Sequence, residues 1–253
     1  MPTYRITLGY DGTDFHGYAA NPGIRTVQGE LDAALAVVLG APVRTAVAGR
    51  TDAGVHARAN VVSFEAEHPV DPGRLQRSIT SMLGPEIVAV DAAEAPDGFH
   101  ARFSATSRRY VYRINGSEVP DPLTRRTAWH VPHRLDIDAM NRAAAAMVGV
   151  HDFASLCRAA PGGTTVRTVL SAMWRVEPSG PLFEVEGQAF CHQMVRSMVA
   201  LCVEVGRARL AADAVPGTLE ALDRDAARGA APPHGLVLWE IGYPVGDSTR
   251  RQV

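Results

Sequence analysis

Strand-like and helix-like segments are mixed along this chain, and their order restricts the fold more than any other feature of the sequence. Apolar and polar residues alternate, as on a half-buried strand, in residues 4–8, 110–114, 173–176, 183–185 and 236–239. Helical segments do not follow these strands in strict alternation. Because a doubly wound parallel sheet needs that alternation, we expect an α+β fold with a mostly antiparallel sheet.

Apolar residues also recur with helical spacing in four segments. The first spans residues 27–38, with Thr26 placed as an N-cap and Gly40 as a stop. The others are expected at residues 136–149, at 194–206 and after Pro216.

The two parts of the chain repeat a similar rhythm of strand, long helix, paired strands, helix and strand. This rhythm predicts an N-terminal α+β half (residues 1–103) and a C-terminal α+β half (residues 104–245), with a cleft between them. The remaining residues, 246–253, are expected to form a polar tail.

Composition excludes several classes of protein. No apolar run approaches the roughly 20 residues that span a bilayer, and the first residues lack the apolar stretch of a signal peptide. We therefore expect a soluble cytoplasmic protein. Cys157, Cys191 and Cys202 are odd in number and lack CxxC spacing, which argues against a disulfide framework or a structural zinc site. No GxGxxG or GxxxxGK[ST] nucleotide-binding loop is present.

The basic residues are unusual in kind, although the formal net charge of −2 does not indicate a nucleic-acid-binding protein. All 25 are arginine, and a guanidinium pairs with phosphate and stacks on bases. Residues 102–113 contain four arginines and three aromatic residues, with Arg108, Tyr110 and Tyr112 on one face of a strand. This pattern suits phosphate contact with base stacking, and equally an edge strand with a solvated basic face.

The segment AGRTDAGVHA, at residues 48–57, is the first candidate for chemistry. Gly49 and Gly54 flank an Arg50-Thr51-Asp52 core, so the backbone can turn tightly there. An adjacent guanidinium can hold a carboxylate in its ionised form, which suits Asp52 as a catalytic group. The alternative is an ordinary turn between two strands, at residues 43–48 and 60–64.

The segment FCHQMVR, at residues 190–196, enters the third helix. His192 and Arg196 are four residues apart, so they are expected to share a helix face. Because an unpaired interior charge is costly, an arginine on this apolar helix needs a partner, for which Asp52 is a candidate. Alternatively, Arg196 points to solvent.

Four segments in this order resemble the tRNA pseudouridine synthase A family. They are YDGTDFHG followed by TVQGEL, then AGRTDAGVHA, FHARFSATSRRYVYRI and FCHQMVR, and the resemblance extends from about Tyr4 to about Tyr243. It implies two similar α+β halves in one extended, mostly antiparallel sheet, with helices on one face and a central active-site cleft. It also implies a homodimer that binds one tRNA across both subunits, without a metal or a cofactor.

The same resemblance assigns roles to four residues. It implies that Asp52 is the nucleophile and that Arg50 acts beside it. It also implies that Tyr110 stacks on the target base and that Arg196 pairs with Asp52. The sequence departs from the family after the first motif, where Gly17-Tyr18 and the next residues replace a usual tryptophan and a glutamine-arginine pair.

The implied activity is the isomerisation of uridine to pseudouridine at positions 38, 39 and 40, in the anticodon arm of tRNA. Two other functions are compatible with parts of the pattern. One is a pseudouridine synthase that acts on another RNA, such as ribosomal RNA. The other is an RNA-binding module without catalysis, which would not need a carboxylate facing the anionic backbone.

Overall fold

The computed structural model describes residues 1–158 and 163–244. The chain divides into two compact units. Unit 1 contains Met1–Arg108 and the end of the chain from Leu238, and unit 2 contains Arg109–Val237. The sequence had placed the division after residue 103 and left the end of the chain in the second half. The difference arises because the last strand returns to unit 1, where it lies next to an N-terminal strand. The expected polar tail, residues 246–253, lies outside the described residues.

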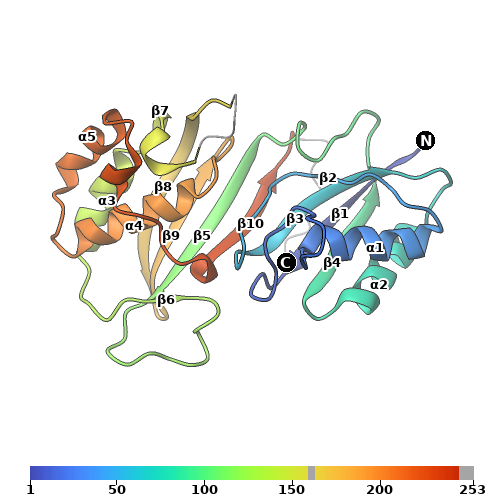
Figure 1. The fold of residues 1–253 in the computed structure, drawn as a ribbon, viewed down its shortest axis with the longest axis horizontal. Coiled ribbons are helices and arrows are strands. Elements are labelled where there is room, and N and C mark those ends of the chain that lie inside the picture. Colours follow the sequence, from blue (N-terminus) through green and yellow to red (C-terminus); the bar gives the residue numbers. More distant parts are fainter. Residues whose placement is uncertain (159–162, 245–253) are drawn as a thin grey trace. The chain divides into compact units, whose positions relative to one another are not determined.

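Unit 1 is built on an antiparallel sheet (Figure 1). Its strands, in spatial order, are β4 (Ile87–Glu94), β1 (Thr3–Tyr10), β3 (His56–Glu65) and β10 (Leu236–Gly242), with β2 (Ala46–Val47) paired to β3. Helices α1 (Val27–Leu39) and α2 (Pro72–Leu83) contact each other, and α2 also contacts β4. Since helices on opposite faces of a sheet cannot touch, both cover the same face.

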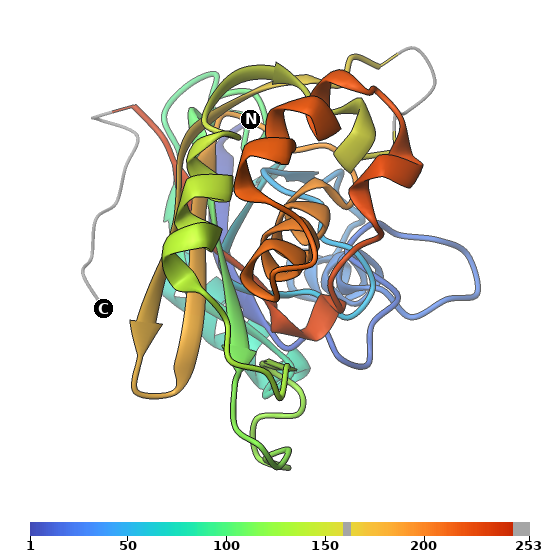
Figure 2. The ribbon, with the colours of Figure 1, turned by 90° about the vertical axis from the view of Figure 1, so that its left-hand side faces the viewer.

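Unit 2 has the strand order β5 (Ser107–Asn115), β9 (Gly180–Gly187), β8 (Val166–Glu177) and β7 (Gly149–Asp152), with β6 (Trp129–His130) parallel to β5. Figure 2 shows the β8–β9 hairpin extending beyond the helices of this unit. The helices are α3 (Ile137–Ala145), α4 (Met194–Gly206) and α5 (Val215–Glu220). Short 3-10 turns are η1 (Ala154–Leu156), η2 (Ala212–Ala214), η3 (Arg224–Ala227) and η4 (Pro233–Gly235). The predicted α+β class with a mostly antiparallel sheet, here of ten strands, is confirmed.

The helix boundaries follow from local chemistry. The Thr26 hydroxyl accepts the Gly29 N–H at the start of α1, and Gly40 ends the helix in the left-handed conformation, as predicted. Asp136 caps α3, but that helix ends at Ala145 and not near residue 149, where the sequence pattern placed its end. Gly149 has a φ of 112° and opens β7, so the helical pattern could not continue to it.

Each unit has its own apolar core. In unit 1 the fully buried side chains include Ile6, Leu8, Leu31, Leu35 and Ile79. In unit 2 they include Met140, Phe153, Phe183, Met198 and Leu201. Within the described part of the chain, none of the helices has the length and apolar character that crossing a bilayer requires.

Candidate active site

The segment around Asp52 forms a loop, residues 48–55, between β2 and β3 (the Asp52 loop). The flanking strands were expected at residues 43–48 and 60–64, but β2 has only two residues and β3 begins already at His56. Asp52 is half-buried in this loop and Arg50 is exposed. Asp52 and Arg50, the two predicted catalytic residues in this segment, therefore lie on a loop and not on a strand. The position of that loop depends on contacts with other residues.

Asn60, on β3, fixes the start of the loop. It is fully buried, and its side chain donates to the Gly49 carbonyl at 2.8 Å and accepts the Gly49 N–H at 3.3 Å. The Asn60 amide also donates to the Tyr10 hydroxyl at 3.2 Å, and that hydroxyl lies 2.9 Å from Thr51 Oγ1. The residues on both sides of Arg50 are thus tied to the sheet by a buried polar network.

Residues 10–18, which include the YDGTDFHG motif, hold the part of the Asp52 loop from Thr51 to Gly54. The Tyr18 N–H donates to the Thr51 carbonyl at 3.0 Å, and the Gly54 N–H donates to the Phe15 carbonyl at 3.3 Å. Gly17 has a φ of +96°, and a Cβ there would lie 3.1 Å from the Thr51 carbonyl oxygen. This close approach explains why a glycine is needed beside the loop. The loop is therefore preorganised by backbone contacts that do not involve the Asp52 carboxylate.

Tyr18, which stands at the departure from the family pattern, is a core residue. Its side chain is fully buried, and its ring centroid lies 6.3 Å from that of Tyr10. Burial raises the pKa of Tyr18 well above its usual value, with Tyr10 and Asp32 adding to the effect and Arg50 opposing it. Tyr18 thus contacts the Asp52 loop from the core of unit 1 and not from its surface.

Tyr10 makes the stability of unit 1 sensitive to alkaline pH. Burial raises its pKa from 10.0 to about 12, against the hydrogen bonds from Thr51 and Asn60 that lower it. A raised pKa means that the folded protein keeps a proton that the unfolded chain loses above pH 10. The stabilisation is therefore complete below pH 10 and is lost as the pH rises towards 12, by about 2–3 kcal/mol.

Urea unfolding of the wild type and Tyr10→Phe between pH 8 and pH 12 measures this loss. The Phe variant removes only one of the tyrosines, so the difference between the two proteins isolates Tyr10. A constant difference across this pH range would contradict the assignment.

Arg108, at the start of β5, binds backbone carbonyls of unit 1. Its Nε and Nη2 donate to the Ala48 carbonyl at 3.3 and 3.0 Å. The same Nη2 donates to the Arg102 carbonyl at 2.9 Å, and Nη1 donates to the Ala105 carbonyl at 3.2 Å. The sequence had grouped Arg108 with the residues suited to phosphate contact. The structure instead uses this guanidinium to tie residues 102–105 to the beginning of the Asp52 loop.

Arg108→Ala should lower the free energy of unfolding by about 2–4 kcal/mol, because three carbonyl groups lose charge-assisted hydrogen bonds. Arg108→Lys should recover only part of this, since a single ammonium cannot reproduce the fork of a guanidinium. Urea unfolding measures both values. Arg77→Ala, at an exposed arginine of α2, is the matched control and should stay near the wild type. Equal stability of the Arg108→Ala and Arg77→Ala variants would contradict the tethering role.

In unit 2, Tyr110 lies on β5 and Arg196 on α4. The Tyr110 ring is buried and meets the Phe190 ring edge-on, with centroids 5.3 Å apart and planes at 86°. Arg196 Nε donates to the Ala231 carbonyl at 2.7 Å, and the Arg196 carbonyl accepts the Ala231 N–H at 3.0 Å. Both residues therefore have defined supports within their own unit.

Arg196 also acts on Tyr112. Burial raises the pKa of Tyr112 far above its usual value, and the Arg196 charge opposes that rise. The Tyr112 hydroxyl donates to the Pro232 carbonyl at 2.9 Å, next to the carbonyl that Arg196 binds. Arg196 and Tyr112 thus bind the same short segment before β10.

The expectation that His192 and Arg196 share a helix face is wrong. Helix α4 begins at Met194, and Gln193 before it has a φ of 66°, so helical spacing does not extend back to His192. The His192 carbonyl instead accepts the Arg158 N–H at 3.1 Å in an isolated β-bridge. Asp52 and Arg50 belong to unit 1, whereas Tyr110 and Arg196 belong to unit 2. The pairing of Arg196 with Asp52 therefore stays a prediction.

Sequence reasoning missed Tyr10 and Asn60, which hold the Asp52 loop most directly. Asn60 did carry a signal, because it is a polar residue that directly precedes the apolar pair Val61 and Val62 within a strand. A buried polar side chain must find partners, and a neighbouring glycine-rich turn is an obvious place for them. Tyr10 carried no such signal, since a tyrosine at a strand end is ordinary.

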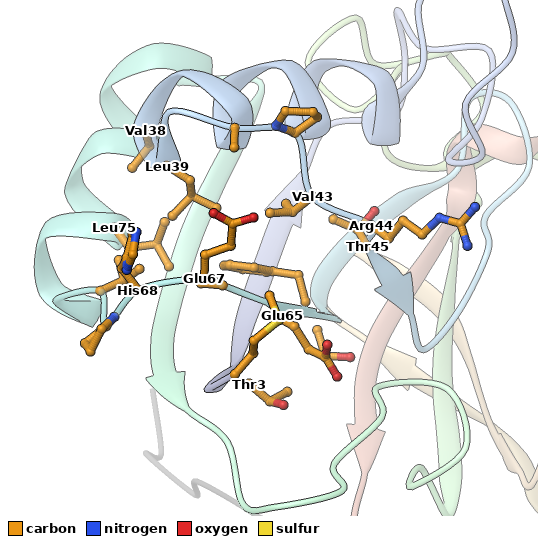
Figure 3. A pocket seen from close by; sticks show the side chains of 18 of the residues that line it. Thr3, Val38, Leu39, Val43, Arg44, Thr45, Glu65, Glu67, His68 and Leu75 are labelled. Carbon is orange, nitrogen blue, oxygen red and sulfur yellow. The ribbon is translucent and has the colours of Figure 1, made fainter.

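A pocket of about 700 Å³ lies elsewhere in unit 1 (Figure 3). Its lining includes Leu39, Arg44, Glu67, His68 and Leu75, whereas none of residues 47–56 lines it. Acidic and basic side chains both line this pocket, so its charge does not select one kind of ligand. Within the described residues, no group of three or more His, Cys, Asp or Glu side chains is placed to hold a metal ion.

Comparison with known proteins identifies relatives over nearly the whole length of the chain. A family model described as tRNA pseudouridine synthase matches residues 143–244. The tRNA pseudouridine synthase A of Leifsonia xyli subsp. xyli is 45% identical, over 96% of this chain and 92% of the relative. The enzymes of the same name from Frankia casuarinae and Moorella thermoacetica are 44% and 42% identical, over 95% and 96% of this chain and 89% and 100% of their own lengths. This chain therefore belongs to the tRNA pseudouridine synthase A family.

Proposed function

We propose that this protein isomerises uridine to pseudouridine at positions 38, 39 and 40 in the anticodon arm of tRNA. The observation that carries the proposal is the half-buried Asp52 in a loop that hydrogen bonds to Asn60, Tyr10 and Tyr18 hold in place. A fixed carboxylate suits a reaction in which a nucleophile must meet one atom of the substrate. Relatives named tRNA pseudouridine synthase A support tRNA as the substrate.

The reaction breaks the bond between C1′ of the ribose and N1 of the uracil, and forms a bond between C1′ and C5. The hydrogen on C5 leaves as a proton and N1 gains one, so the atoms balance without a redox change or a group donor. The substrate itself supplies every atom, so the proposal needs neither a cofactor nor a metal. Asp52 supplies the nucleophilic carboxylate near C1′ and C6.

Three further residues have proposed roles. A uridine in a stem must leave the base stack, which costs a few kcal/mol. Tyr110 stacks on the extruded base and recovers about 1–3 kcal/mol of that cost. Arg50, exposed two residues before Asp52, contacts the extruded nucleotide or its phosphate. Arg196 pairs with Asp52 and keeps it ionised and oriented, as the family resemblance implies.

The proposed assembly is a homodimer that binds one tRNA across both subunits, and the proposed location is the cytoplasm, where tRNA is modified. Both proposals rest on membership of the family and not on an observed contact between subunits. The molar mass of the protein in solution, alone and with tRNA, tests the dimer: one tRNA for each two chains is expected.

Release of tritium from RNA labelled at C5 of uridine tests the proposed reaction. With a chelator present and no cofactor added, wild-type protein should release tritium from tRNA transcripts but not from ribosomal RNA fragments. Release from ribosomal RNA alone would favour a pseudouridine synthase with another substrate. Tight tRNA binding without release would favour a non-catalytic RNA-binding protein.

Tyr110 offers a separate test. Tyr110→Phe keeps the ring and should bind tRNA as the wild type does, while the loss of the hydroxyl slows tritium release about 100-fold. Tyr110→Ala should also weaken tRNA binding, because the stacking surface is lost. Single-turnover tritium release and tRNA affinity, measured for both variants, separate the two roles. A fully active Phe variant beside an inactive Ala variant would limit the tyrosine to stacking.

A further inference from the structure

An exposed aromatic side chain is held out by a fixed turn in unit 1, residues 99–105 (the Phe103 turn). Phe103 is 76% exposed. The turn that carries it is well tied, since the Ser104 N–H donates to the His100 carbonyl at 2.9 Å and the His100 N–H donates to Ser104 Oγ at 3.0 Å. The Tyr243 hydroxyl also donates to the Ala101 carbonyl, at 2.7 Å. Phe103 is therefore exposed from an ordered backbone.

Phe103 has a second ring and a guanidinium as neighbours. The His100 ring lies 4.4 Å from the Phe103 ring, centroid to centroid, with 31° between the planes. The guanidinium carbon of the exposed Arg102 lies 5.5 Å from the centroid of the Phe103 ring. His100 Nδ1 accepts the N–H groups of Arg102 and Phe103, at 3.2 and 3.4 Å, which fixes the imidazole against the turn. Two rings and one guanidinium thus lie together on the surface.

The Phe103 turn lies beside the Asp52 loop within unit 1. One guanidinium, that of Arg108, binds the carbonyls of Arg102 and Ala105 in the turn and the carbonyl of Ala48 in the loop. Ala48 precedes Asp52 by four residues. The turn and the beginning of the Asp52 loop are therefore held to each other within unit 1.

We propose that Phe103, with His100 and Arg102, is a stacking site for an unpaired base of the bound tRNA. This inference rests on the proposed function. An aromatic face takes any base, and an adjacent arginine adds attraction to the phosphate or to the base itself. Bases within a duplex are already stacked on both faces, so the site selects the unpaired nucleotides of the anticodon loop.

The test compares three substitutions at Phe103 in the full-length protein. Phe103→Ala and Phe103→Leu should each weaken tRNA binding by about 5- to 150-fold, measured by fluorescence anisotropy at fixed salt, because neither side chain stacks on a base. Phe103→Trp should bind within about threefold of the wild type, since it keeps an aromatic face. Saturating tRNA should also quench the fluorescence of the introduced tryptophan. Val37→Ala, which changes a 71% exposed side chain of α1, is the matched control and should bind as the wild type does.

Wild-type affinity in Phe103→Ala, or equal binding by the Leu and Trp variants, would overturn the stacking site. Dissociation of a wild-type dimer in Phe103→Ala would also overturn it, because the surface would then be a contact between subunits. Thermal unfolding of each variant near the wild-type temperature shows that the fold is intact. The binding comparison is separate from the proposed reaction, which fails if the wild type binds tRNA but releases no tritium.

Discussion

Asp52→Asn should lower the rate of pseudouridine formation at least about 10⁴-fold, while tRNA binding stays close to that of the wild type. Asparagine has nearly the shape of aspartate, so the Asp52 loop keeps its hydrogen bonds to Asn60, Tyr10 and Tyr18. Those bonds involve the backbone and side chains of neighbouring residues and not the carboxylate. The variant loses the negative charge and the nucleophilic oxygen, both of which the proposed reaction needs. Tritium release under single-turnover conditions and tRNA affinity measure the two effects.

The matched control for this prediction is Asp97→Asn, which makes the same chemical change at an exposed position of unit 1. It should leave the rate and the affinity unchanged. A rate for Asp52→Asn within tenfold of the wild type would exclude Asp52 as the nucleophile. A parallel loss of rate and of tRNA affinity would indicate that the substitution disturbs the loop and not only its chemistry.

Gly12→Ala should have the second largest effect, because a Cβ at this position would overlap the backbone carbonyl of Val55. The obstacle is main chain, so it cannot rotate away, and the Tyr10–Tyr18 segment and the Asp52 loop must separate. A displacement of about 1 Å at a catalytic group costs about 100-fold in rate, and overpacking of this kind costs about 3 kcal/mol of stability. Single-turnover rates and urea unfolding measure the two losses.

Gly217→Ala is the control for Gly12→Ala. An added Cβ at Gly217, in α5, would have no atom within 4 Å, so this variant should keep the wild-type rate and stability. If Gly12→Ala were as stable and as active as Gly217→Ala, the close approach of the two segments would not be needed to hold the loop.

Much of the fold follows from local signals in the sequence. Helices α1 and α4 were predictable, since α1 has a cap at Thr26 and a stop at Gly40, and α4 has a long apolar pattern. Helix α2 was expected from the rhythm of the N-terminal half but was given no residue range, because it buries only Leu75 and Ile79, although Asp71 and Pro72 mark its start. The return of β10 to unit 1 was also missed, because strand pairing across more than 150 residues leaves no local pattern.

The candidate site was predictable to a lesser degree. Asp52 and Tyr110 were identified from motifs that resemble a family, and their structural supports were not. Arg108 shows why. From its position in the sequence, an arginine on a strand can equally well face solvent, bind a phosphate or donate to backbone carbonyls, and only the tertiary fold places the carbonyls around it. His192 was placed on the helix in error, because the left-handed conformation of Gln193 ends the helical spacing before it reaches His192.

The most direct test of the central claim is to map pseudouridine in tRNA transcripts after reaction with wild-type protein. Two transcripts are compared, one with uridine at positions 38, 39 and 40 and one with cytidine at all three, with compensating changes that keep the stem paired. We predict pseudouridine only at these positions in the first transcript, and neither pseudouridine nor tritium release in the second. Equal modification of the second transcript would contradict the proposed target, and an unmodified first transcript would contradict the proposed reaction itself.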